Sequence, residues 1–343
     1  MEKNQVSCLI SMDKMPKLAQ LSNPPNPERI SHTLRANGKI LLTGEYFVLD
    51  GATAMALPTT LGQSLRLSEA TGSEIVWKSY DPKGQLWFSA SFDLMDFKAM
   101  KTSDQTISDT LSSILKAASR LNSDFLSHWK KYKIDTYLEF DKAWGLGSSS
   151  TLISCIAQWA EVSPYHLLFD TLGGSGYDVA CAQADGPILY QLGADELNID
   201  YVEFEPEFLP QLYLIYLEKK QDSKAARDFY YKNRGHLNGA LEHISKISES
   251  IPECKKLSEF EKAIEEHEDI VSKCLGMPKV KGEYFSDYWG SVKSLGAWGG
   301  DFVLATSEAA ETETRNYFSQ KGFTTILKLA ELMRSESHAE VGV

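Results

Sequence analysis

A glycine- and serine-rich segment over residues 145–150 is the part of the chain whose residue types most directly indicate chemistry. It consists of Gly145, Leu146, Gly147, Ser148, Ser149 and Ser150. A predicted strand over residues 134–140 precedes it, and a predicted helix begins near Ser149. The first N–H groups of a helix lack a partner and attract anions, glycines let the backbone approach them, and serine hydroxyls can bind phosphate or Mg2+. The segment predicts a phosphate-binding loop, with a serine cap and two turn glycines as the alternative.

Two common nucleotide-binding loops do not match this chain. The P-loop requires Ser or Thr after its Gly-Lys pair, whereas Gly38 and Lys39 are followed by Ile40. The dinucleotide fingerprint requires a third glycine where Ser150 stands, and an acid at the end of a strand about 20 residues further on. The predicted loop therefore belongs to neither class.

A second segment, Gly173 to Ala180, places Asp178 in a glycine-rich loop just before an apolar stretch. Such a loop can hold a carboxylate close to a substrate hydroxyl, where it acts as a general base. A helix cap or a turn residue is the alternative for Asp178 taken alone. A third glycine-rich segment, residues 294–301, precedes a strand-like run, and it would close over a ligand or form a tight interdomain turn.

Several cations and a hydroxyl follow the apolar run at residues 212–217. They are Lys219, Lys220, Ser223, Lys224 and Arg227. Near a predicted helix start, these groups suit a carboxylate or phosphate of a substrate. A solvated basic helix face is the alternative.

The elements that must position these segments are mixed without strict strand–helix–strand order. Apolar runs and alternation predict strands at residues 39–42, 64–68, 74–78, 85–92, 134–140 and 212–217, and within 293–307 and 322–327. Helical spacing predicts helices at residues 103–121, 164–172, 223–248 and 252–275, one from residue 149, and one between the last two strands. The pattern predicts an α+β fold in two domains.

The composition excludes several classes of protein. The chain has 343 residues, with 35 Lys and Arg against 47 Asp and Glu, so its formal net charge is −12. This length suggests about two domains, and 43% hydrophobic with 24% charged residues is typical of globular proteins. The acidic balance argues against nucleic-acid binding, and no apolar run approaches the roughly 20 residues of a membrane span.

The cysteine pattern and the chain ends bear on location. Five dispersed cysteines form no Cys-x-x-Cys pair, which is typical of a reducing compartment. Residues 1–30 are rich in turn formers and lack the apolar core of a signal peptide; we expect loose tails at residues 1–30 and 336–343. We therefore expect a cytoplasmic protein that acts on a small molecule, with no nucleic-acid or membrane partner. The oligomeric state stays open, a homodimer included.

The run Gly38 to Tyr46 and the three glycine segments, in this order, resemble the motif layout of the GHMP kinases. That family includes galactokinase, homoserine kinase, mevalonate kinase and phosphomevalonate kinase. The run Gly174 to Ala180 is similar to the phosphomevalonate kinase version and to a bacterial branch with a GYDIA-type signature. The resemblance implies a ribosomal-S5-like N-terminal domain over residues 31–205 and a ferredoxin-like C-terminal domain over residues 206–335, with ATP and substrate between them.

The resemblance also implies a role for each matched residue. Lys39 would stabilise charge on the γ-phosphoryl group and lower the pKa of the acceptor hydroxyl, which Asp178 would orient or deprotonate. Glu45 would lie near the nucleotide, residues 145–150 would hold its phosphates, and Ser149 would ligate Mg2+. The residues beside the substrate would be Gly176, Tyr177, Gly296, Gly299 and Gly300, with Lys220 and Ser223 near its anionic groups.

Several positions depart from the family pattern. Leu167 stands where mevalonate kinase has a Mg2+-binding glutamate, which leaves Asp170, three residues later, as the candidate second Mg2+ ligand. Trp298 occupies a position that is usually glycine, and it would narrow the substrate pocket or change loop closure. Asp301 follows where a small or apolar residue is common, and Asn37 stands where proline is frequent.

The resemblance implies an ATP- and Mg2+-dependent kinase acting on mevalonate or phosphomevalonate in isoprenoid precursor synthesis. A galactose- or homoserine-type kinase is the alternative within the family. A catalytically inactive nucleotide-binding regulator is the alternative of another class. An inactive regulator would lack Lys39 or Asp178, and both are present.

Overall fold

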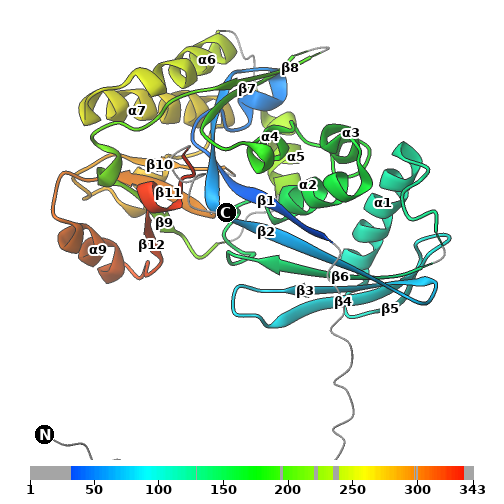
Figure 1. Ribbon diagram of the computed structural model, residues 1–343. Coiled ribbons are helices and arrows are strands. Elements are labelled where there is room, and N and C mark those ends of the chain that lie inside the picture. Colours follow the sequence, from blue (N-terminus) through cyan, green and yellow to red (C-terminus); the bar gives the residue numbers. More distant parts are fainter. Residues whose placement is uncertain are drawn as a thin grey trace, which may run out of the picture.

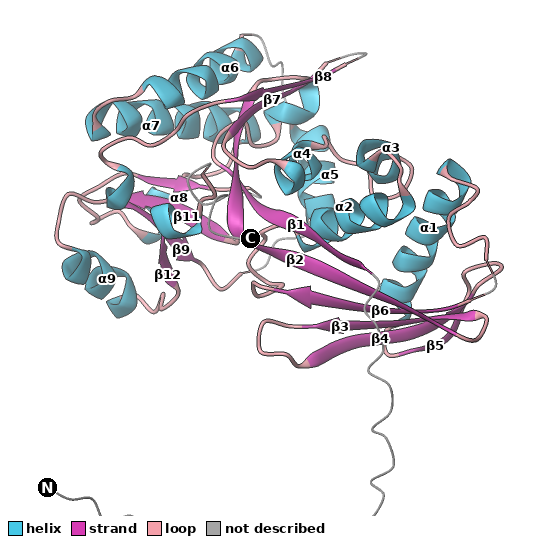
Figure 2. Ribbon diagram, viewed as in Figure 1, coloured by secondary structure: helices cyan, strands magenta, loops and turns pink. Residues whose placement is uncertain are grey.

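The computed structural model of the chain describes residues 32–128, 130–193, 196–219, 223–234, 239–296, 298 and 300–335. The tails expected at residues 1–30 and 336–343 lie outside these ranges. The described residues form two sheets with helices packed against them (Figure 1, Figure 2). No helix among them combines the length and the apolar character that crossing a membrane requires.

The first sheet has the strand order β5-β4-β3-β6-β2-β7-β8, and β1 pairs with β2 outside this path. The strands are β1 (His32–Leu41), β2 (Ala54–Ala70), β3 (Glu74–Tyr80), β4 (Leu86–Asp93), β5 (Ala99–Thr102), β6 (Lys131–Leu138), β7 (Ile188–Leu192) and β8 (Leu197–Tyr201). In β2, Leu65 and Leu67 are buried while Arg66 between them is exposed, as the period of two in a half-buried strand requires.

A bulge in β1 redirects the chain at Lys39. Asn37 pairs with Gly62 but Lys39 pairs with Pro58, so the register shifts between Asn37 and Lys39. A Cβ on Gly38, between them, would lie only 2.5 Å from the hydroxyl oxygen of Thr59. Bulges re-aim the residues beside them, and here the backbone N–H of Lys39 donates to the carbonyl of Leu146 (2.9 Å). The bulge therefore joins β1 to the glycine- and serine-rich loop.

Four helices lie along one face of this sheet (Figure 1). They are α1 (Gln105–Leu121), α2 (Ser148–Ala160), α3 (Pro164–Phe169) and α4 (Tyr177–Gln183). The carboxylate of Asp104 caps α1 by accepting a hydrogen bond from the backbone N–H of Ile107 (3.1 Å). Apolar residues of α1 and α2, such as Leu111 and Ile153, fill the core between the helices and the sheet.

The second sheet is antiparallel, with the order β10-β11-β9-β12. Its strands are β9 (Leu212–Tyr216), β10 (Val292–Ser294), β11 (Phe302–Thr306) and β12 (Ile326–Lys328). Along the chain, β9 and β10 are separated by the helices α5 (Ser223–Asn233), α6 (Ala240–Ser250), α7 (Leu257–Leu275) and α8 (Val280–Tyr284). Helix α9 (Glu311–Gln320) joins β11 to β12, α10 (Leu329–Leu332) follows β12, and the 3-10 turns are η1 (Phe47–Asp50), η2 (Leu209–Gln211) and η3 (Ile251–Glu253). The strand order is that of a ferredoxin-like domain, so the predicted α+β fold is confirmed.

The structure corrects several predicted bounds. The helix predicted over residues 223–248 is two helices, α5 and α6. The helix predicted from residue 252 begins at Leu257, because the preceding residues form η3 and a β-conformation cap. Helix α3 ends at Phe169 rather than at residue 172. β8 ends at Tyr201 and β9 begins at Leu212, so the expected boundary near residue 205 lies between the two sheets.

Candidate active site

The side chain of Lys39 lies where three segments from distant parts of the chain meet. A Cβ on Gly147 would lie 3.1 Å from Cγ of Lys39, so the lysine stem packs on the phosphate loop. The lysine Nζ lies 5.6 Å from the ring centre of Tyr177, at the start of α4. Asp301, from the third glycine segment, is close enough to affect the lysine charge. The structure therefore brings all three glycine segments to one place.

Lys39 is held in its charged form. Burial alone would lower its pKa, but Tyr177, Asp178 and Asp301 act in the opposite direction and raise the pKa of Lys39 above its ordinary value of 10.5. An ammonium group therefore stands beside the predicted phosphate loop over the whole physiological pH range.

Asp178 lies in the first turn of α4, next to this ammonium group. Gly176, with φ of 92°, gives the chain the left-handed conformation from which the helix begins. One carboxylate oxygen of Asp178 accepts the backbone N–H of Val179 (3.1 Å). Burial raises the pKa of Asp178 above 3.8, while the charges of Lys39 and Arg227 act against this rise. A carboxylate with a raised pKa beside a cation is suited to accept a proton.

The loop at residues 145–150 presents a helix N-terminus. Gly147 precedes α2 with φ of 90°, and no side chain among the described residues caps the helix. The first intrahelical bond joins the N–H of Thr151 to the carbonyl of Gly147 (3.0 Å), so the N–H groups of Ser148 and Ser149 have no partner within the helix. Ser149 is exposed, which leaves its hydroxyl accessible to a ligand. Helix α2 therefore presents an uncapped N-terminus at the loop where the sequence predicted phosphate binding.

Ser150 was predicted to bind the nucleotide, but its hydroxyl has a structural partner. It donates to the carbonyl of Gly147 (2.8 Å), and the residue is only 2% exposed. The neighbouring Thr151 is held in the same way, because its hydroxyl donates to the side-chain oxygen of Gln63 (2.6 Å). These two hydroxyls shape the loop rather than face a ligand.

The third glycine segment packs directly on the phosphate loop. A Cβ on Gly145 would lie 2.3 Å from a carboxylate oxygen of Asp301, and Gly145 has φ of 66°. Asp301 itself has φ of 51°, and its backbone bonds to Leu217 and Lys219 fix this conformation. Gly296 and Gly300 precede Asp301 in the same segment, whereas Gly299 lies outside the described residues.

The indole of Trp298 packs in the core, which does not support the expectation that it narrows a substrate pocket. Its indole is 4% exposed and its ring N–H donates to the carbonyl of Pro278 (3.0 Å), within a cluster that includes Tyr46, Tyr230 and Val271. The backbone N–H of Trp298 donates to the hydroxyl of Tyr46 (2.9 Å). The large ring therefore fills the core between Tyr46, which ends the run that begins at Gly38, and the second domain.

Glu45 also lies away from any nucleotide-accessible surface. It is 0% exposed, and one of its oxygens accepts from Nζ of Lys293 at 2.5 Å. The predicted contact with a nucleotide is not one that this position offers. Sequence reasoning missed Lys293, although a lysine within an apolar strand next to a glycine segment is an available signal.

Ser149 and Asp170, the two predicted metal ligands, do not contact each other among the described contacts. Asp170 is exposed at the end of α3, and Leu167 is fully buried in the core. Within the described ranges, no group of three or more His, Cys, Asp or Glu side chains could hold a metal ion. Ser149 is the one predicted ligand that lies at the phosphate loop.

Arg227 is the predicted cation that reaches the aspartate side of the site. It extends from α5, and one guanidinium nitrogen donates to the carbonyl of Leu172 (3.4 Å). Another lies 3.0 Å from where a Cβ on Gly174 would stand, and the charge lowers the pKa of Asp178. Lys219 instead donates to the hydroxyl of Tyr284 (2.7 Å). Lys220 lies outside the described residues, as does the side chain of Ser223.

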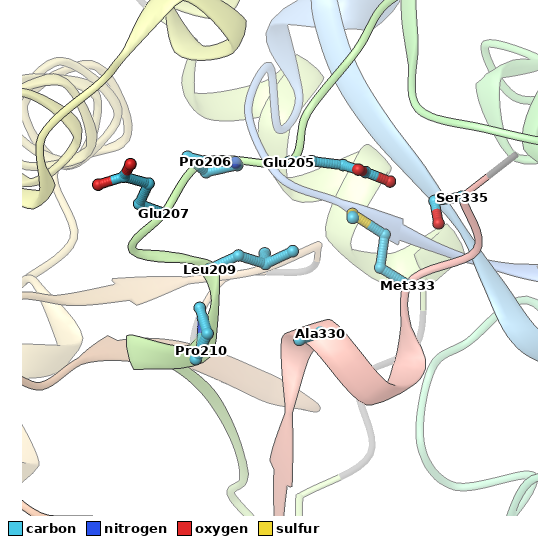
Figure 3. A pocket seen from close by; sticks show the side chains of 8 residues that line it. All are labelled: Glu205, Pro206, Glu207, Leu209, Pro210, Ala330, Met333 and Ser335. Atoms are coloured by element: carbon cyan, nitrogen blue, oxygen red, sulfur yellow. The ribbon is translucent and has the colours of Figure 1, made fainter. Parts of the chain in front are cut away.

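Two cavities in the described part of the chain lie apart from this site. One, of about 340 Å3, lies between the segment after β8 and residues 330–335, where Glu205 points toward Met333 and Ser335 and Glu207 points away (Figure 3). The other, of about 480 Å3, is lined by β7, β8 and Glu249 of α6. Neither is lined by Lys39 or Asp178.

Comparison with solved structures relates the chain to several small-molecule kinases. Mevalonate kinase from Methanococcus jannaschii superposes with a TM-score of 0.64 at 17% identity, over 86% of this chain and 96% of that one. Streptococcus pneumoniae phosphomevalonate kinase, in complex with phosphomevalonate and AMPPNP, gives 0.64 at 16% identity, over 87% and 100%. Lactococcus lactis galactokinase, complexed with galactose, gives 0.63 at 11% identity, over 88% and 92%.

No protein-family model matches the sequence, and no curated protein matches it either. The likeness is therefore one of fold. The chain has the two-domain fold of the GHMP kinases, as the order of its motifs predicted.

Proposed function

We propose that the chain is an ATP-dependent kinase that transfers the γ-phosphoryl group to a small-molecule acceptor. The observation that carries this proposal is the meeting of Lys39, Asp178 and the N-terminus of α2, which come from three separate segments of the chain. The fold supports it, because phosphomevalonate kinase of the same fold binds AMPPNP together with its acceptor.

In the proposed reaction each group has one task. The N–H groups of Ser148 and Ser149 bind the phosphates of ATP. The Lys39 ammonium stabilises the charge that develops on the transferred phosphoryl group, and Asp178 orients the acceptor hydroxyl and accepts its proton. Phosphoryl transfer needs positioning and charge stabilisation rather than a covalent enzyme intermediate. These groups supply both kinds of interaction.

Mg2+ is the expected partner of the nucleotide. Proteins bind this ion through one or two of their own oxygens together with the phosphates, and it would neutralise charge on those phosphates. The exposed hydroxyl of Ser149 fits such a role. Asp170 does not, because it lies exposed at the end of α3 with no contact to the loop among those described.

We propose mevalonate or phosphomevalonate as the acceptor, which would place the enzyme in isoprenoid precursor synthesis. Arg227 supports an anionic acceptor, because it brings a guanidinium to the aspartate side of the site and forms no ion pair among the described residues. Galactose lacks such a charge. Homoserine carries a carboxylate, so it stays in the comparison as the alternative from the amino-acid class.

A coupled assay of ADP release with mevalonate, phosphomevalonate, galactose and homoserine tests the proposal. We expect turnover with one of the two anionic isoprenoid precursors. Asp178→Asn should remove turnover while AMPPNP still binds, and the exposed Asp109→Asn on α1 serves as the matched control. Turnover with none of the four acceptors, in a protein that binds AMPPNP, would favour the inactive regulator. Unchanged turnover in Asp178→Asn would exclude the assigned base.

A further inference from the structure

The turn that follows β1, residues 43–46, contacts the second domain through consecutive residues. The hydroxyl of Thr43 donates to the hydroxyl of Ser248 on α6 (2.8 Å). The backbone N–H of Gly44 donates to Nε2 of His267 on α7 (2.9 Å). Both bonds are buried, so they form where the two domains exclude water.

The next two residues continue the pattern on different elements. Glu45 accepts from Nζ of Lys293 on β10 (2.5 Å). The hydroxyl of Tyr46 accepts from the backbone N–H of Trp298 (2.9 Å), and its ring stacks on Tyr230 of α5 with centres 5.4 Å apart. Residues 43–46 therefore bind α6, α7, β10 and the third glycine segment in sequence.

The backbone of this turn has little freedom to adjust. Gly44 has φ of 91°, and a Cβ there would lie 2.5 Å from Cβ of Ala54. Tyr46 has φ of 63°, which a residue with a bulky side chain rarely adopts. Such a conformation persists where surrounding contacts determine it, and the four contacts with the second domain do so here.

The ion pair at its centre belongs to a fully buried cluster. Glu45 and Lys293 are 0% exposed, and His267 and Glu268 of α7 are 0% and 2% exposed. His267 uses Nε2 as an acceptor for the N–H of Gly44, so the imidazole is neutral, and burial keeps its pKa well below 6.5.

Burial raises the pKa of both carboxylates in this cluster. Two carboxylates and one ammonium would carry a net charge of −1, which the interior disfavours. Burial raises the pKa of Glu268 to about 8, against the smaller effects of Lys293 and Lys279. Burial also raises the pKa of Glu45, but Lys293 and the backbone N–H groups of Glu45 and Gly296 oppose it. The geometry makes Glu45 the counter-ion of Lys293, because one oxygen of Glu45 accepts from Nζ of Lys293 and the other lies 3.1 Å from Nε2 of His267.

We propose that residues 43–46 form an interdomain clasp in which Glu45 and Lys293 are positioning residues for phosphoryl transfer. Glu45 follows β1, which carries Lys39. Lys293 lies on the strand that leads into the third glycine segment, which returns through Asp301 onto Gly145. The buried pair therefore fixes the second domain relative to the lysine and the phosphate loop.

Kinetics separates positioning from direct binding of the nucleotide. Removing a residue that binds ATP raises the dissociation constant of the nucleotide. Removing a positioning residue lowers kcat and leaves that constant unchanged. The kinetic part of this test rests on the proposed function.

The test uses the full chain with Glu45→Gln, Lys293→Met and the double variant. We expect each single variant to lower kcat at least tenfold, with the dissociation constant of AMPPNP changed by less than twofold. The double variant should be no slower than the slower single variant, because both remove one interaction. The exposed pair Glu242 and Lys246 on α6, 2.6 Å apart, provides matched controls, E242Q and K246M. A tenfold weaker AMPPNP affinity in Glu45→Gln with unchanged kcat would overturn the proposal, as would no change in either quantity.

Hydrogen exchange gives a readout that does not need turnover. We expect the amides of residues 292–296 to exchange faster in Glu45→Gln than in the unaltered chain or in E242Q, and equal exchange would contradict the clasp. If Glu45→Gln does not fold, Thr43→Val takes its place in both measurements, because it removes another hydrogen bond of the same turn. If the unaltered chain turns over no acceptor, the proposed function fails, while AMPPNP affinity and exchange still decide on the clasp.

Discussion

The carboxylate of Asp301 occupies the space that a side chain on Gly145 would need. A Cβ at this position would lie 2.3 Å from one carboxylate oxygen and 2.6 Å from the carboxyl carbon. Asp301 belongs to the second domain and Gly145 to the phosphate loop of the first. The contact therefore places an acidic group of one domain against the predicted phosphate loop of the other, within range of the Lys39 charge.

Gly145→Ala should weaken nucleotide binding. Alanine at φ of 66° is strained by about 1–2 kcal/mol, and its Cβ must also displace Asp301. We expect the dissociation constant of AMPPNP to rise roughly tenfold or more, since about 1.4 kcal/mol corresponds to a factor of ten. Isothermal titration calorimetry measures this constant directly.

Gly84→Ala is the matched control for that substitution. Gly84 lies in the hairpin turn between β3 and β4 with φ of 73°, and no described atom lies within 4 Å of its Cβ position. It shares the backbone strain but not the contact. If both variants bind AMPPNP equally well, the packing of Asp301 on Gly145 has no part in shaping the loop.

The sequence predicted the residues that meet around Lys39 better than those that hold the two domains together. Glycines beside Ser149 and Asp178 are required by backbone geometry, and such requirements are local enough to be read from residue order. The positive φ values of Gly147 and Gly176 agree with this. Local chemistry thus predicted segments that the fold brings together around Lys39, and their roles as phosphate loop and acid stay a proposal.

The roles of Glu45 and Trp298 could not be read in the same way. Each lies in a glycine-bearing motif, yet each side chain points into the interface with the other part of the chain. Which side of a turn faces the interior depends on partners far along the sequence, here Lys293 and Pro278. Ser150 differs from Ser149 for a related reason, because it is buried and its hydroxyl donates to the carbonyl of Gly147, whereas Ser149 is exposed.

The pH dependence of turnover should report the raised pKa of Asp178. The base must be unprotonated to accept a proton, so activity should fall as the pH drops through the pKa of its carboxyl. Because burial raises that pKa, we expect the acid limb of kcat above pH 3.8. AMPPNP affinity measured over the same range should not follow this limb. An acid limb centred below pH 3.8 would contradict the assignment of the base.

Arg227→Gln should weaken binding of an anionic acceptor without affecting ATP. A hydrogen bond to a charged group is worth about 1.5–3 kcal/mol, so the KM for the acceptor should rise by roughly tenfold to a hundredfold. Arg227→Lys keeps the charge but loses the planar guanidinium fork. Its KM for the acceptor should therefore lie between those of the unaltered chain and Arg227→Gln. Steady-state kinetics with each substrate varied in turn measures both constants.

The exposed Arg120, near the end of α1, provides the control for charge alone. Arg120→Gln changes the net charge equally, far from the glycine loop. An equal rise of the acceptor KM in both variants would mean that Arg227 acts only through the overall field. A rise in the KM for ATP alone would place Arg227 on the nucleotide side instead.

Glu268→Gln should remove a pH dependence from the stability of the folded chain. Burial raises the pKa of Glu268 from about 4.5 to about 8, so the folded protein binds a proton that the unfolded chain releases between these values. The stabilisation from this group is complete below pH 4.5 and is lost progressively as the pH rises to about 8. Each pH unit corresponds to about 1.4 kcal/mol, so the loss amounts to several kcal/mol. Glutamine mimics the protonated acid and should keep the protein stable at pH 8.

Urea unfolding at pH 5.5 and pH 8 measures this difference. We expect the free energy of unfolding of the unaltered chain to fall between the two pH values, and that of Glu268→Gln to fall by much less. The exposed Glu253→Gln in η3 should behave like the unaltered chain. Equal pH dependence in Glu268→Gln and the unaltered chain would mean that Glu268 is ionised in the folded state. In that case Lys293 would be shared between two charged carboxylates, and Glu268 would remain as its counter-ion after Glu45 is removed.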